Sequence, residues 1–118
     1  MENLDFICIK YGQQMPDKDS ENIIRKALGV LKEDGVYAMF LWLETKDNEI
    51  KKKLIPLLNE PIIKKYLLNG SDKFPDNFKD LTEKLRDIAQ DINKLFFLKK
   101  ILERTLIYAL YHSKINQV

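Results

Sequence analysis

The feature of this chain that most restricts its fold is an apolar stripe between residues 78 and 95. Apolar side chains recur there at spacings of three, four, three, four and three, at Phe78, Leu81, Leu85, Ile88, Ile92 and Leu95. This spacing puts every member on one face of an α-helix, whereas a half-buried strand would need an apolar residue at every second position. The stripe therefore predicts a helix with one buried face.

The scarcity of turn residues extends the helical prediction to the whole chain. The 118 residues include only 4 Gly and 4 Pro, fewer turn signals than folds made of short strands require. The length is sufficient for one hydrophobic core without disulfides or a metal. We therefore predict one all-α domain over residues 1–118, a compact bundle of about five to six helices with a long C-terminal helical hairpin or bent helix.

The first helix is predicted over residues 4–11, where apolar side chains share one face, and it should end near Gly12. A polar loop over residues 13–20 follows. Asp19 or Ser20 at its end can accept the free backbone N–H groups of the next helix.

Two further helices are predicted in the first half of the chain. One covers residues 21–33, and Gly35 can adopt the left-handed conformation that stops it. The segment from residue 36 to 43 is apolar almost all round, which predicts a central helix surrounded by protein. Trp42 should lie in the same core.

Two prolines are expected to set helix boundaries in the middle of the chain. A start signal at residues 45–47 predicts a helix through Leu58, which Pro56 would bend or end because its ring clashes with the carbonyl four residues back. Pro61 can occupy the first turn of another short helix that ends at residues 69–70. The C-terminal third is then either one helix of nearly forty residues or two; we favour a break near Asp91, where an N-cap is available.

The residues that catalysis requires are nearly absent. His112 is the only histidine and Cys8 the only cysteine, and a lone cysteine in an N-terminal helix is usually a small apolar core residue. Two soft ligands do not make a zinc site, and no glycine-rich phosphate loop is present. We predict no enzymatic activity, no metal and no cofactor.

The cellular compartment can be predicted from the cysteine content, the N-terminal residues and the length of the apolar runs. A single cysteine forms no intramolecular disulfide, and the N-terminal residues do not resemble a secretory signal. The longest apolar run, residues 36–43, is much shorter than the roughly 18 to 20 residues that span a bilayer. A cytoplasmic protein without a membrane role is expected.

Charge is unevenly distributed although its total is only +2. Residues 46–70 carry six Lys or Arg against three Asp or Glu, and residues 92–118 carry five against one. A phosphate backbone binds such zones through counterion release, and Tyr108 and Tyr111 could add stacking surfaces. The candidate RNA-binding residues are therefore chosen by charge clustering: Lys51, Lys52, Lys53, Lys64, Lys65, Lys99, Lys100 and Arg104. The alternative is that these are solvated helix faces.

Two segments resemble a known family. Residues 27–44 (ALGVLKEDGVYAMFLWLE) and 101–115 (ILERTLIYALYHSKI) together resemble the small helical subunit of Cmr-type, type III-B CRISPR effector complexes. The resemblance covers 33 of 118 residues and contains no catalytic signature. It implies an all-helical, non-catalytic subunit of a ribonucleoprotein in antiviral defense, which lines the channel for target RNA and contacts guide or target RNA and the larger effector subunits.

Two hypotheses remain open. The leading one is this CRISPR-associated RNA-binding subunit; the charge asymmetry also permits head-to-tail self-association. The alternative is a helical protein-interaction adaptor without nucleic-acid contact, which would bind through an exposed apolar groove beside residues 36–43.

Overall fold

The computed structural model describes residues 3–17, 20–46, 48–68 and 72–116, and every regular element within these ranges is a helix. In chain order the described helices are α1 (Leu4–Gln14), α2 (Glu21–Asp34), α3 (Val36–Lys46), α4 (Asn48–Leu58), α5 (Pro61–Leu67), α6 (Phe78–Ala89) and α7 (Ile92–Asn116). The all-α prediction is confirmed, with seven described helices in place of five or six. The radius of gyration of 13.5 Å agrees with the roughly 13.5 Å expected for a compact chain of this length.

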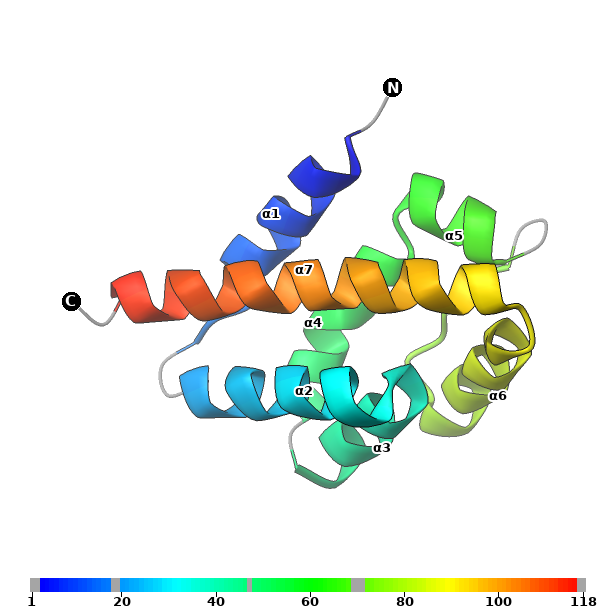
Figure 1. Ribbon diagram of the computed structural model, residues 1–118, viewed down its shortest axis with the longest axis horizontal. Helices are drawn as coiled ribbons and strands as arrows, with labels where there is room; N and C mark the ends of the chain where they lie inside the picture. The colour runs from blue at the N-terminus through cyan, green and yellow to red at the C-terminus, as the bar shows by residue number, and fades with distance from the viewer. Residues whose placement is uncertain (1–2, 18–19, 47, 69–71, 117–118) are drawn as a thin grey trace.

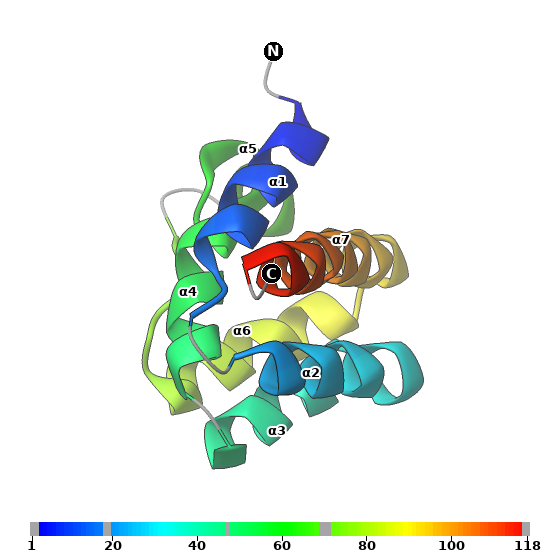
Figure 2. The same ribbon diagram turned by 90° about the vertical axis from the view of Figure 1, so that its left-hand side faces the viewer.

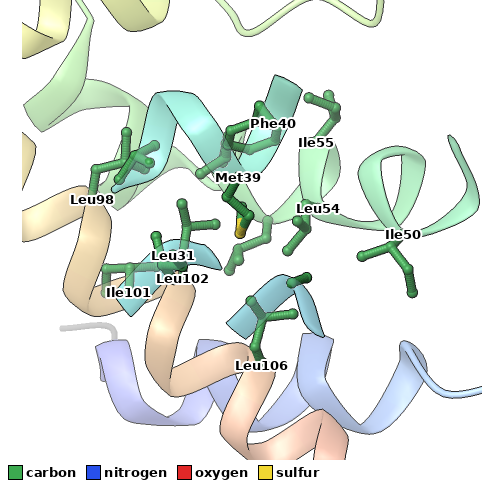
Figure 3. Packing of buried hydrophobic residues seen from close by; sticks show 14 of the residues in the cluster. Leu31, Met39, Phe40, Ile50, Leu54, Ile55, Leu98, Ile101, Leu102 and Leu106 are labelled. Atoms are coloured by element: carbon green, nitrogen blue, oxygen red, sulfur yellow. The ribbon is translucent and has the colours of Figure 1, made fainter. Parts of the chain in front are cut away.

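Helix α7 is the axis around which the other helices are arranged (Figures 1 and 2). In Figure 2, which looks nearly along α7, α1 lies above it, α4 to its left and α2 below it. Its buried residues are spaced mainly at three and four, and they are Leu98, Ile101, Leu102, Thr105, Leu106, Ala109 and Ser113. Figure 3 shows several of them meeting Met39 and Phe40 of α3 and Leu54 of α4 in one core.

The predicted break near Asp91 is confirmed. Helix α6 ends at Ala89 and α7 begins at Ile92. The Asp91 carboxylate accepts hydrogen bonds from the backbone N–H groups of Asn93, at 3.0 Å, and Lys94, at 3.2 Å. Asp91 thus satisfies two of the amides that the first turn of α7 leaves free, which is the function of an N-cap.

The predicted end of the first helix near Gly12 is wrong, because α1 continues to Gln14. Gly12 is buried where α1 crosses α7, and a Cβ there would lie 2.9 Å from the Thr105 carbonyl oxygen. The glycine therefore serves close approach of two helix backbones and does not stop the helix. The C-cap residue is Met15, and its N–H bonds to the Gly12 carbonyl.

Helix α2 begins at Glu21 as predicted and ends at Asp34, one residue later than predicted; its glycine stop agrees with the prediction, whereas its N-cap differs. Gly35 has a φ of 101°, and its N–H bonds to the carbonyls of Val30 and Leu31, as a glycine stop requires. Ser20 occupies the N-cap position, but its hydroxyl donates to the Asp17 carbonyl, and it makes no bond to the first turn of α2. The other candidate, Asp19, lies outside the described residues.

Helix α3 is buried on one face only. Met39, Phe40 and Leu43 are fully buried, whereas Tyr37 and Leu41 are 36% and 41% exposed. The prediction that this segment is surrounded by protein is therefore wrong for one face of the helix. Trp42 packs against the core and is half-buried.

Pro56 does not end α4. The helix continues to Leu58, the predicted end, and Pro56 is accommodated in its last turn. Pro61 occupies the first turn of α5 as predicted. The predicted end of α5 at residues 69–70 lies outside the described residues, and the last described helical residue is Leu67.

Candidate nucleic-acid interface

Lys51, the first candidate RNA-binding residue, is buried in the interior of the protein. Its side chain is only 7% exposed, and its ammonium group donates to Glu44 Oε2 at 2.8 Å and to the Asp76 carbonyl at 3.3 Å. These two bonds connect α4 to α3 and to the segment before α6. The Lys51 ammonium therefore joins three parts of the fold, and its charge is satisfied by protein.

The next two candidates, Lys52 and Lys53, also have protein partners. Lys53 Nζ donates to the Met15 carbonyl at 2.8 Å and to Asp17 Oδ2 at 2.6 Å, which fastens the end of α1 to α4. Lys52 is exposed and lies 3.7 Å from the Glu49 carboxylate, one turn earlier on the same helix. Paired ammonium groups release fewer counterions from a phosphate chain than free ones. Residues 51–53 are therefore the weaker part of the candidate interface.

The lysines of α5 are arranged differently. Lys65 is exposed, Lys64 is half-exposed, and neither forms an ion pair within the described ranges. The next residue, Tyr66, packs edge to face against Phe97 of α7, with ring centroids 4.8 Å apart and an interplanar angle of 66°. This contact holds α5 beside the N-terminal half of α7 (Figure 1).

On α7, Lys100 is exposed and Lys99 is half-exposed, and both are without an ion pair among the residues described. Arg104 is committed to α1, because its guanidinium donates to Asp5 Oδ1 at 3.0 Å. The same oxygen accepts a hydrogen bond from the Tyr108 hydroxyl at 2.8 Å. Tyr108 first, and Arg104 second, hold the pKa of Asp5 below its ordinary value, while the Asp5 carboxylate raises the pKa of Tyr108.

The Tyr66–Phe97 contact thus brings α5, from one basic zone, beside α7, from the other. Lys64 and Lys65 precede the Tyr66–Phe97 contact, and Lys99 and Lys100 follow it within one turn of α7. Two aromatic side chains at this place are open to solvent, since Tyr66 is 45% exposed and Phe96 is 61% exposed. We call this surface the α5–α7 face and define it by Lys64, Lys65, Tyr66, Phe96, Lys99 and Lys100.

The exposed aromatics of this face differ from those chosen by sequence. Tyr108 has its hydroxyl bonded to Asp5, and Tyr111 is 62% exposed with the Lys114 ammonium 5.9 Å from its ring centroid. Tyr66 and Phe96 were missed. A signal existed for one of them: two consecutive phenylalanines on a helix point about 100° apart, so Phe96 and Phe97 cannot both face one core.

Cys8 and His112, the two residues considered for catalysis, lie apart in the fold. Cys8 is fully buried with its Sγ 3.8 Å from the Ile101 carbonyl oxygen, and burial raises the pKa of its thiol. His112 lies eleven residues beyond Ile101 on α7, which corresponds to roughly 16 Å along the helix axis. Within the described residues, no three His, Cys, Asp or Glu side chains form a group that could hold a metal ion.

Comparisons of the chain with protein-family models, with curated proteins and with solved structures found no match. The family resemblance of residues 27–44 and 101–115 therefore stays a hypothesis. In the part of the chain that the structure describes, no helix combines the length and the apolar character needed to cross a membrane.

Proposed function

We propose that this protein is a non-catalytic, RNA-binding subunit of a ribonucleoprotein, and that RNA contacts it at the α5–α7 face. The observation that supports this most directly is the Tyr66–Phe97 contact, because it brings α5, which carries Lys64 and Lys65, beside the part of α7 that carries Lys99 and Lys100, where Tyr66 and Phe96 are exposed. Ammonium groups without protein partners attract a phosphate backbone, and exposed rings stack on unpaired bases without sequence preference. The face accordingly suits a single strand better than a duplex.

The remaining lysines have a different role in this proposal. Lys51 and Lys53 each hold two polar partners on other segments, so they support the fold that presents the face. Arg104 is held at Asp5 and contributes less to the attraction of phosphate than Lys100 does. RNA contact is thus assigned chiefly to Lys64, Lys65, Lys99 and Lys100.

The family resemblance supplies the biological setting. A small helical subunit of a Cmr-type CRISPR effector would line the channel for target RNA, associate with larger subunits and act in antiviral defense in the cytoplasm. The all-α fold is compatible with such a subunit. Recovery of large CRISPR subunits and short guide RNAs with the tagged protein, purified from its host, would support this setting; recovery of unrelated proteins without RNA would contradict it.

RNA contact at the face can be measured directly. Binding of a fluorescein-labelled oligouridylate is followed by anisotropy over a range of salt concentrations, for the wild type and for the triple variant Lys64→Gln, Lys65→Gln, Lys100→Gln. Each lost phosphate contact lowers the slope of log affinity against log salt by about 0.7 for a single strand, so the triple variant should lose about 2.

A matched control removes the same charge elsewhere. Lys26, Lys32 and Lys79 are exposed on α2 and α6, away from the face, and their replacement by Gln should leave the slope close to that of the wild type. If the two triple variants lower the slope equally, the RNA senses net charge only, and the assignment to the α5–α7 face is wrong.

A further inference from the structure

Helices α1 and α7 come closest at Gly12, and toward the N-terminus of α1 they stay connected through the side chains of Cys8 and Asp5. At Gly12 an added Cβ would lie 2.7 Å from Tyr108 Cβ. From there α1 rises away from α7 toward its own N-terminus (Figure 1). Because the two backbones separate, side chains from both helices line a wedge-shaped hollow between them.

This hollow, the α1–α7 wedge, has a volume of about 280 Å³ and is open along one side. Its wall is mainly apolar and is formed by Leu4, Cys8, Phe97 and Ile101. Asp5, Lys100 and Arg104 lie at its rim. The volume suits one large apolar side chain better than a whole small molecule, because a bound small molecule usually has most of its surface enclosed.

The charges at the rim determine which chemistry complements the wedge. Asp5 and Arg104 are paired with each other at 3.0 Å and largely neutralise one another. Lys100 is left as an exposed ammonium without an ion pair in the described part of the chain. A carboxylate next to the inserted apolar side chain would pair with it, whereas a second cation there would be repelled.

We infer that the α1–α7 wedge is a docking site for a protein segment in which a phenylalanine or leucine stands beside acidic residues. The apolar side chain fills the space between Leu4, Phe97 and Ile101, and the adjoining carboxylate pairs with Lys100. An RNA base is a poorer occupant, because its polar edges would find few partners on the apolar wall. The site shares Lys100 with the α5–α7 face, but its apolar wall does not belong to that face and peptide docking there does not depend on RNA binding.

The probe for this site is a capped, eight-residue peptide with one phenylalanine flanked by pairs of glutamates, added to ¹⁵N-labelled full-length protein. We expect amide shifts at Leu4, Cys8 and Ile101, and about tenfold weaker binding of the same peptide with lysines in place of glutamates. Leu4→Trp fills the wedge and should weaken binding about tenfold. Phe6→Trp is the control, because Phe6 is 63% exposed on the same helix and does not line the wedge.

Several results would overturn the inference. These are no binding of the acidic peptide to the wild type, equal binding of the acidic and basic peptides, and equal effects of Leu4→Trp and Phe6→Trp. Leu4→Glu provides a second variant if Leu4→Trp lowers the melting temperature, since its carboxylate would repel the same peptide. Loss of oligouridylate binding in Leu4→Trp, with peptide binding intact, would assign the wedge to the RNA surface instead. None of these variants changes Lys64 or Lys65, so the RNA proposal is tested separately.

Discussion

Replacement of Gly12 by alanine is the sharpest test of how α1 packs on α7. The new Cβ would lie 2.7 Å from Tyr108 Cβ, 2.9 Å from the Thr105 carbonyl oxygen and 3.2 Å from the Ala109 amide nitrogen. Two of these three atoms belong to the backbone of α7 and cannot rotate away. Helix α1 must therefore shift off α7 to accept even one methyl group.

The magnitude follows from two opposing effects. Overpacking of a buried site costs about 1–3 kcal/mol, and alanine gains about 1 kcal/mol over glycine within a helix. Because the obstacle is backbone, the cost should lie in the upper part of its range. We expect Gly12→Ala to lower the free energy of unfolding by about 1–2 kcal/mol.

Gly29→Ala is the matched control. Gly29 is an exposed position in α2 with no atom within 4 Å of an added Cβ, so only the gain in helix propensity applies. It should stabilise the protein by up to about 1 kcal/mol. Thermal unfolding followed by far-ultraviolet circular dichroism should then separate the two variants by roughly 4–12 °C. A Gly12→Ala protein that is as stable as the wild type would refute the close approach of α1 and α7.

Two further predictions concern the polar contacts. Tyr108 and Arg104 lower the pKa of Asp5 below its ordinary 3.8, so the Asp5 carboxylate stabilises the fold above that pH and this contribution is lost as pH falls through the lowered pKa. Urea titrations at several pH values should show that Asp5→Asn is less stable than the wild type at neutral pH. In acid the stabilities of the two proteins should converge. Lys51→Met should lower the free energy of unfolding by about 1–3 kcal/mol, because it leaves Glu44 and the Asp76 carbonyl without their donor. The control Lys52→Met should change it by less than about 0.5 kcal/mol. Equal effects would contradict the burial of Lys51.

Most of the helical architecture could be predicted from periodicity and caps. The part of the stripe from Phe78 to Ile88, the cap at Asp91 and the stop at Gly35 each depend on residues within a few positions of one another, whereas Ile92, which continues the same spacing, begins the next helix and is 61% exposed. Local signals of this kind are visible in a sequence because the interactions that they describe are local. Gly12 is the counterexample, because the atoms that leave no room for a Cβ there belong to α7, more than ninety residues away.

The candidate interface was harder to predict for the same reason. Charge clustering treats the three lysines 51–53 alike, yet one is buried, one is paired with α1 and one is exposed. Successive residues of a helix point about 100° apart, so a run of like charges cannot share one environment. The partners that decide each case, Glu44, Asp17 and the Asp76 carbonyl, are contributed by distant segments.

The junction between α6 and α7 also governs whether the chain completes its core alone. The sequence on both sides of Gln90 and Asp91 is helix-forming, and a continuous helix from Phe78 to Asn116 would be roughly 58 Å long, against a longest extent of 44 Å for the folded protein. The apolar face of α6 would then leave its own core and could be covered only by another molecule, as in a domain-swapped dimer. By capping α7, the Asp91 carboxylate favours the sharp reversal that keeps α6 on its own chain.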